Sequence, residues 1–224
     1  MGIFVAFDLD DTLYKEIDFV KSAHNHIAHI LSKKYENYHN DILTILVENK
    51  SPFDPLCDFI KFIGGDEDIS WMLKEYRYHT PNITLDPVVE NCLIKLHDSN
   101  IPMGIITDGR CSSQSNKIKA LGLHKYISKN NIIISEEIGY DKYHDSGFKL
   151  IMSSNPKCDK FYYIGDNLSK DFYWPNQLGW ITICIKDNGL NIHPQNFNID
   201  KEYLPQYIIH NFSEIIPLIL YGTK

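Results

Sequence analysis

The sequence predicts an α/β fold, a Rossmann-like parallel sheet core with an inserted all-helical cap domain. Three observations predict it. Residues 3–7 form a short apolar run rich in β-branched and aromatic side chains, which is typical of a buried strand. After residue 84, strand-like runs alternate with helical patterns, as in a parallel sheet covered on both faces. Residues 15–84 show helical periodicity only. We therefore expect a discontinuous α/β core, residues 1–14 and 85–224, and a helical cap, residues 15–84.

The further expected strands are short apolar runs that end at polar residues or glycine. They lie at residues 101–106, 132–134, 161–164, 180–185 and 207–209. The expected helices carry apolar residues at steps of three and four. In the insert they lie near residues 19–31, 42–47, 55–63 and 69–78, and in the core near 86–97, 112–121, 148–153, 168–177 and 212–220. Residues 188–201 are polar, and we expect a long surface loop there.

Composition narrows the class of partner. The 224 residues carry a net charge of −7, and the sequence pI is about 5.8. This acidic balance disfavours nucleic acid and anionic membranes as partners. No apolar run approaches the length that crosses a bilayer. We expect a small molecule as the partner and a monomer or small homo-oligomer as the state.

Cysteine usage indicates a reducing compartment. The five cysteines are odd in number, and none forms a C-x-x-C pair. This pattern fits neither a disulfide framework nor a zinc site. No basic segment precedes the first apolar run, so a secretory leader is not expected. We therefore expect a cytoplasmic protein.

Carboxylates crowd the end of the first strand. Asp8 and Asp10 are two residues apart, so in extended chain their side chains point the same way. Like charges this close repel each other, and a divalent cation would remove that cost. Mg²⁺ prefers hard oxygen ligands of this kind. The alternative is an acidic turn that caps the following helix.

Polar residues also follow the next three strands. Thr107 follows the second strand, Lys142 lies beyond the third, and Asp166 and Asp171 follow the fourth. The carboxyl ends of parallel strands lie at one edge of the sheet, where ligands bind. Singly, Lys142 fits a solvated loop lysine, Thr107 a hydroxyl bonded to its own backbone, and the aspartates fit helix caps. Together they suit phosphoryl transfer, which depends on positioning and charge neutralisation.

Four segments carry a family resemblance. Residues 8–12 (DLDDT), 107–109 (TDG), 139–142 (GYDK) and 165–171 (GDNLSKD) resemble, in order, the four motifs of the haloacid dehalogenase-like (HAD) hydrolase superfamily. The helical insert after the first motif resembles that superfamily's C1 cap. The resemblance therefore covers the whole chain and implies a phosphatase of the C1-capped type.

The resemblance implies a role for each matching position. Asp8 would attack phosphorus and form an aspartyl-phosphate. Asp10 would protonate the leaving oxygen and later deprotonate the hydrolytic water. Lys142 would offset negative charge on Asp8 and on the phosphate. Mg²⁺ would be bound by Asp8, Asp166 and the carbonyl of Asp10. Asp171 would support Lys142 or the metal's water shell. Thr107, with backbone N–H groups near Asp108 and Gly109, would hold the phosphoryl oxygens.

One position departs from the motif pattern. Tyr143 follows Lys142 where the family usually has proline. Lys149 is therefore a competing candidate for the motif-three lysine, and Lys117 and Lys119 are weaker ones.

Asp10 separates the activities within the family. Members that cleave carbon–halogen bonds lack the acid/base aspartate at this place, so the resemblance favours a phosphatase. We expect a Mg²⁺-dependent enzyme that hydrolyses a small phosphorylated metabolite of unspecified identity. The alternatives are a sugar phosphomutase on the same core and a non-catalytic ligand-binding protein.

Overall fold

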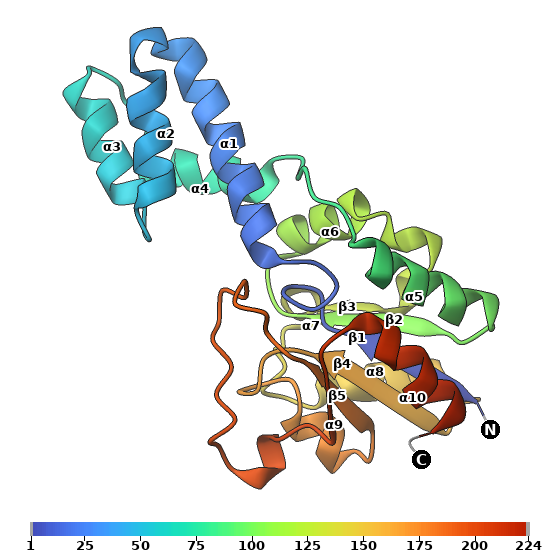
Figure 1. Cartoon of the computed structure of the whole chain (residues 1–224). Coiled ribbons are helices and arrows are strands. Elements are labelled where there is room, and N and C mark those ends of the chain that lie inside the picture. The colour runs from blue at the N-terminus through green and yellow to red at the C-terminus, as the bar shows by residue number, and fades with distance from the viewer. Residues whose placement is uncertain (1, 223–224) are drawn as a thin grey trace. The chain divides into compact units, whose positions relative to one another are not determined.

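A computed structural model describes residues 2–222 of the chain, which contain a six-stranded sheet (Figure 1). The strand order is β3-β2-β1-β4-β5-β6, and every neighbouring pair is parallel. The strands are β1 (Ile3–Phe7), β2 (Met103–Thr107), β3 (Ile132–Ile134), β4 (Lys160–Gly165), β5 (Ile181–Ile185) and β6 (Tyr207–Ile209). The predicted α/β fold class is confirmed.

Helices cover both faces of this sheet. They are α5 (Pro87–Asp98), α6 (Cys111–Ala120), α7 (Ser135–Ile138), α8 (Ser146–Ser154), α9 (Tyr173–Gln177) and α10 (Ile215–Tyr221), with short 3₁₀ turns at Leu123–Lys125, Lys129–Asn131, Lys201–Tyr203 and Phe212–Glu214. Alternate side chains of β1 point to opposite faces. Phe4 belongs to the cluster that contains α8 residues, whereas Phe7 stacks on Phe212, with ring centroids 6.3 Å apart. Burial on both sides explains why β1 is an unbroken apolar run.

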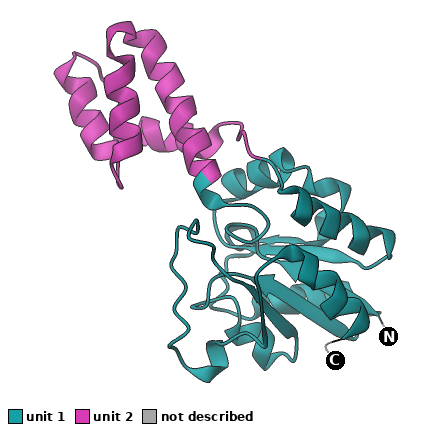
Figure 2. Ribbon diagram, in the orientation of Figure 1, with its two compact units in different colours: residues 1–17, 84–224 teal, residues 18–83 magenta. Residues whose placement is uncertain are grey.

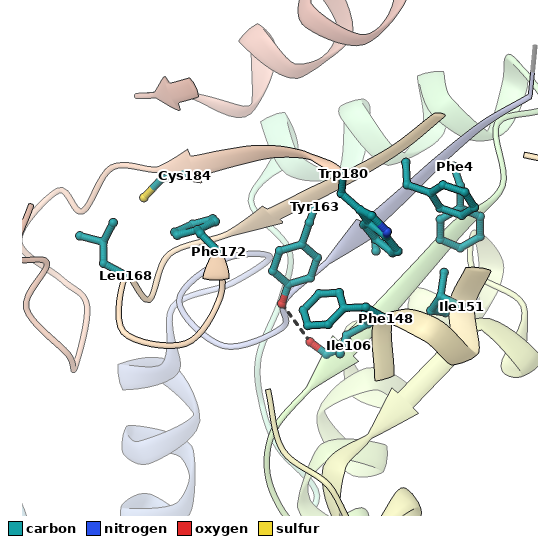
Figure 3. Close-up of a cluster of buried hydrophobic side chains, with 11 residues drawn as sticks. Phe4, Ile106, Phe148, Ile151, Tyr163, Leu168, Phe172, Trp180 and Cys184 are labelled. Atoms are coloured by element: carbon teal, nitrogen blue, oxygen red, sulfur yellow. Dashed lines mark hydrogen bonds between the residues drawn. The ribbon is translucent and has the colours of Figure 1, made fainter. Parts of the chain in front are cut away.

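A compact aromatic cluster lies on the α8 side of the sheet (Figure 3). Trp180 packs against Phe161 at a centroid distance of 5.0 Å and against Phe148 at 5.5 Å. Tyr163 lies beside them, and its hydroxyl donates a hydrogen bond to the carbonyl of Ile106 at 3.3 Å. The same hydroxyl lies 3.1 Å from the Lys142 ammonium. Tyr163 therefore joins the apolar core to the polar edge of the sheet.

The chain divides into two compact units (Figure 2). One comprises Met1–Ile17 and Thr84–Lys224, and the other comprises Asp18–Ile83. The second unit is built from most of α1 (Glu16–Lys34) and from α2 (His39–Glu48), α3 (Phe53–Phe62) and α4 (Ile69–Tyr78), with a 3₁₀ turn at Glu36–Tyr38. It has an apolar core of its own, which includes Ile27, Leu31, Ile42, Leu46, Leu56 and Ile60. The assignment of a catalytic core and a cap to such units stays a prediction.

The segment after β4 differs from the expectation. The helix predicted at residues 168–177 exists only as α9, and residues 168–172 form turns. The cause is Asp171, whose side chain turns inward and accepts the backbone N–H groups of Asp166 and Asn167 at 3.1 and 2.8 Å. A side chain that binds the preceding backbone competes with helical hydrogen bonds.

No helix in the described residues combines the length and the apolar character needed to cross a membrane.

Candidate active site

The candidate site lies at the carboxyl edge of the sheet, between β1 and β4. Strand order reverses here, which is where α/β sheets form a ligand crevice. The Asp8 backbone N–H donates to the carbonyl of Ile164 at 2.8 Å and fixes the end of β1 against β4. A cavity of about 130 Å³ opens at this edge. Its lining contains Asp8, Asp10, Asp11, Glu16, Thr107, Asp108, Asp166, Asn167, Lys170 and His193.

A buried lysine contacts Asp8, which lines the cavity. The Lys142 ammonium is 2.5 Å from Asp8 Oδ1 and 2.7 Å from Asp171 Oδ1. Although burial opposes its charge, the carboxylates of Asp171 and Asp8 raise the pKa of Lys142. Lys142 therefore remains an ammonium within the site. Lys149 instead pairs with Asp145 on the surface, where 61% of its side chain is exposed.

Three carboxylates of this edge converge. Asp8, Asp166 and Asp171 each offer an oxygen, and these atoms lie within 4.8 Å of one another. Burial, which outweighs the attraction of Lys142, raises the pKa of Asp8 to about 7. Burial together with the charges of Asp171 and Asp8 raises the pKa of Asp166 to about 9. A divalent cation would relieve this desolvation and repulsion, so the donor set fits a hard metal ion.

Asp171 differs from the other two carboxylates because its oxygens already have partners. Its Oδ1 accepts from Lys142, and its Oδ2 accepts the backbone N–H groups of Asp166 and Asn167. A Cβ at position 165 would lie 2.5 Å from Asp171 Oδ2, so the glycine there makes room for this arrangement. Asp171 thus holds both Lys142 and the turn that carries Asp166.

A second group of side chains surrounds Asp10. The Lys117 ammonium lies 2.7 and 2.9 Å from its two carboxylate oxygens. The Tyr14 hydroxyl donates to Oδ1 at 2.5 Å, and the Gln114 amide donates to Oδ2 at 2.8 Å. Burial opposes ionisation, but Lys117 and these hydrogen bonds prevail and lower the pKa of Asp10. In this arrangement Asp10 is a carboxylate, ready to accept a proton.

The end of β2 carries the predicted phosphoryl-binding residues. Thr107 is buried and accepts a hydrogen bond from the Gln114 amide at 2.7 Å. The carboxylate of Asp108 accepts the backbone N–H of Lys142 at 3.1 Å and pairs with Lys170 at 3.0 Å. The Gly109 N–H donates to the Ser135 hydroxyl at 2.9 Å. Asp108 thus ties the loop of Lys142 to β2, and the Gly109 amide has a protein partner.

Sequence reasoning missed several side chains at this edge. Gln114 and Tyr14 were not singled out, and Lys117 was considered only for the motif-three position. Gln114 and Lys117 are three residues apart on α6, and both are buried. Polar residues on the core-facing side of a helix were the signal that could have revealed them.

The loop after β5 also reaches the site. The Asn191 amide donates to Asp166 at 2.8 Å, and the backbone N–H of Ile192 donates to Asp11 at 2.9 Å. Residues 188–201 were predicted as a polar surface loop, and no pattern within that stretch pointed to the site. The contacts of this loop arise only from the tertiary fold.

Comparison with known proteins agrees with this architecture. Residues 5–181 match the profile of the haloacid dehalogenase-like hydrolase family. The chain belongs to the haloacid dehalogenase-like hydrolase family. The resemblance seen in the four motifs is therefore confirmed, as is the prediction of a hydrolase of this family.

Three similar proteins show how far the resemblance of this HAD-like chain extends. It is 26% identical to the glyceraldehyde 3-phosphate phosphatase of Methanocaldococcus jannaschii, with 96% of each chain covered. Among solved structures, the magnesium-bound HAD-type protein YfnB of Bacillus subtilis aligns with a TM-score of 0.66, at 18% identity, over 98% of this chain and 99% of that one. The HAD phosphatase of Thermococcus onnurineus aligns with a TM-score of 0.60, at 23% identity, over 99% of both chains. These structural likenesses show a shared fold.

Proposed function

We propose that this chain is a Mg²⁺-dependent phosphatase that hydrolyses a small-molecule phosphomonoester through an aspartyl-phosphate intermediate on Asp8. One observation carries the proposal. Asp8 meets the buried Lys142 ammonium at 2.5 Å at the wall of a cavity that Asp10 and Thr107 also line. A carboxylate nucleophile, an acid/base carboxylate and a cation thus share one small space.

The first half-reaction transfers the phosphoryl group to Asp8. A carboxylate oxygen of Asp8 forms a bond to phosphorus while the bond to the ester oxygen breaks. The leaving alkoxide is a poor leaving group without a proton, so Asp10, a carboxylate in the free site, has to take up a proton before it can supply one in this step. A halide ion needs no such proton, so the presence of Asp10 favours phosphate ester cleavage over carbon–halogen cleavage.

The second half-reaction returns the enzyme to its starting state. Water attacks the phosphorus of the acyl phosphate, and the Asp10 carboxylate takes a proton from that water. The bond between phosphorus and Asp8 breaks, which releases inorganic phosphate and regenerates the Asp8 carboxylate. Lys117 lowers the pKa of Asp10, which keeps its carboxylate free to accept this proton, although it also makes that carboxylate a weaker base.

Positive charge makes the approach of an anionic substrate feasible. Lys142 neutralises charge on Asp8 and so on the phosphoryl group that Asp8 receives, and Lys170 lines the cavity itself. Thr107 offers its hydroxyl to a phosphoryl oxygen. Mg²⁺ bound by Asp8, Asp166 and the Asp10 carbonyl would supply further charge neutralisation for the phosphate. Asp171 would support Lys142 and the metal-binding turn.

The helical insert is proposed as the cap, residues 15–84, on a catalytic core of residues 1–14 and 85–224. In support, the side chains that carry the proposed chemistry come from the sheet-containing unit. The partner is a small phosphorylated metabolite. Because the relative from Methanocaldococcus jannaschii is a glyceraldehyde 3-phosphate phosphatase, glyceraldehyde 3-phosphate is the first substrate to test.

The test is phosphate release from glyceraldehyde 3-phosphate, p-nitrophenyl phosphate and a panel of sugar phosphates and nucleotides. We expect turnover with Mg²⁺, loss of turnover with EDTA, and loss of turnover in Asp8→Asn. Equal rates in all three conditions refute the proposal. A phosphate that moves within a sugar phosphate without release identifies a mutase instead.

A further inference from the structure

The Asp10 carboxylate has protein hydrogen-bond partners on both oxygens, although it lies at the wall of the cavity. Its two oxygens accept contacts from Lys117, Tyr14 and Gln114, while about a fifth of the side chain, 19%, remains exposed. A carboxylate that is partly exposed at the wall of a cavity could be solvated by water alone. The chain instead directs several donors at it, so the direction of the carboxylate is fixed.

Lys117 is an unusual residue to find in this position. It lies on α6 and is only 4% exposed, although lysine is among the residues least often buried. Its ammonium lies within 3 Å of both Asp10 oxygens, at 2.7 and 2.9 Å, and Glu16 is the next carboxylate at 3.9 Å. Lys117 does not line the cavity. Its effect on a bound substrate would therefore pass through Asp10.

Gln114 links Asp10 to the phosphoryl-binding end of β2. Its amide nitrogen lies 2.8 Å from Asp10 Oδ2, 2.7 Å from Thr107 Oγ1 and 3.0 Å from the carbonyl of Asp108. All three partners can accept hydrogen bonds, which assigns the amide NH₂ to this side. Gly109 accommodates this contact, because its φ is +139° and a Cβ there would lie 3.2 Å from Gln114 Cδ. The acceptor groups and the glycine at position 109 thus both favour this position of the Gln114 amide.

We propose that Lys117 and Gln114 are positioning residues that hold the Asp10 carboxylate in line with the water that hydrolyses the phosphorylated Asp8. The inference rests on the proposed function and adds to it two residues outside the four motifs. Asp10 takes the proton of the attacking water, the bond between phosphorus and Asp8 breaks, and inorganic phosphate leaves. Lys117 and Gln114 neither give nor take a proton in this step.

The test separates the two half-reactions with p-nitrophenyl phosphate in rapid-mixing experiments. The p-nitrophenolate leaving group departs readily without a proton, so the transfer of the phosphoryl group to Asp8 depends little on Asp10. In Lys117→Met we expect kcat to fall about 10²-fold, the loss typical of a misplaced reacting group, with KM nearly unchanged. We also expect a burst of p-nitrophenol equal to the enzyme concentration, because the phosphorylated enzyme accumulates. A structural defect would lower the burst and the steady rate together.

A matched control and a second variant complete the experiment. Lys119→Met removes an exposed lysine two residues along the same helix and should behave as the parent. Gln114→Leu tests the second oxygen of Asp10 and should give the same burst, which keeps the proposal testable if Lys117→Met lowers the melting temperature. In an Asp10→Asn background, Lys117→Met should have no further effect on kcat, because residues that act through one group are not additive.

The outcomes distinguish this inference from the function on which it rests. A parent protein that releases no phosphate from any substrate overturns the proposed function and this role with it. If the parent protein turns over substrate, and the Lys117→Met and Gln114→Leu variants are folded and have the same kcat as the parent, only the positioning role is overturned. The positioning role is also overturned if Lys117→Met lowers kcat by the same factor in the Asp10→Asn background as in the parent protein.

Discussion

Two regions of the molecule bury their side chains in opposite ways. At the carboxyl edge of the sheet, Asp8, Asp166, Asp171, Lys117 and Lys142 are all buried. In residues 18–83, all of which the structure describes, His79 is the one polar residue among the buried side chains.

The difference separates function from stability. Burying a charge costs free energy unless partners compensate it, whereas burying an apolar side chain is favourable. The helical unit therefore uses its interior for stability. The sheet edge gives up some stability to hold charged groups where a phosphate can meet them. Substitutions at the edge should accordingly affect activity most, and substitutions in the helical core should affect stability alone.

The largest effect is expected for Asp8→Asn. Removing the nucleophile should lower kcat about 10⁴-fold or more, while an asparagine still accepts from Lys142 and leaves the melting temperature close to that of the parent. Phosphate release and thermal melting measure the two quantities. Unchanged activity would remove Asp8 from the mechanism.

Metal removal comes next. EDTA should abolish phosphate release, and added Mg²⁺ should restore it. Because Mg²⁺ binds only the folded carboxylate set, it should also raise the unfolding free energy, by about 2.7 kcal/mol at a hundredfold excess over its Kd. The melting temperature should rise accordingly. Asp166→Asn should lose this stabilisation. A melting temperature that does not respond to Mg²⁺ in the parent would argue against the metal site.

Lys142→Met should reduce both activity and stability. The change leaves Asp8 and Asp171 without their shared cation, and an uncompensated buried charge typically costs about 3–5 kcal/mol. Urea denaturation measures the loss. The matched control is Lys149→Met, whose exposed ion pair should contribute about 0–1 kcal/mol. Equal losses in the two variants would contradict the distinction between the buried and the surface lysine.

Ile60→Ala should act on stability alone. Ile60 is fully buried in the helical unit, and the cavity left behind should cost about 2–5 kcal/mol. Val47→Ala on α2, where the side chain is 76% exposed, is the control and should change the unfolding free energy little. The measurement is urea denaturation followed by circular dichroism. A loss of kcat in Ile60→Ala under conditions where the protein stays folded would contradict the proposed division of labour.

The sequence predicted most of the sheet because short apolar runs have few alternatives. Residues 3–7 and 132–134 match β1 and β3, since strands buried on both faces leave an uninterrupted apolar signal. The prediction failed at residues 168–172. There the local helical pattern lost to the inward turn of the Asp171 side chain, which accepts the backbone N–H groups of Asp166 and Asn167.

The sequence by itself determined the fold class and the strand-end carboxylates Asp8 and Asp166. Local patterns and short spacings encode such features, because a parallel sheet brings the carboxyl ends of its strands together at one edge. Only the tertiary structure decided that Lys142 rather than Lys149 meets Asp8, and that Lys117 and Gln114 surround Asp10. Those contacts join residues more than a hundred positions apart, and they depend on the packed core turning one face of α6 and the turn that carries Lys142 toward the site.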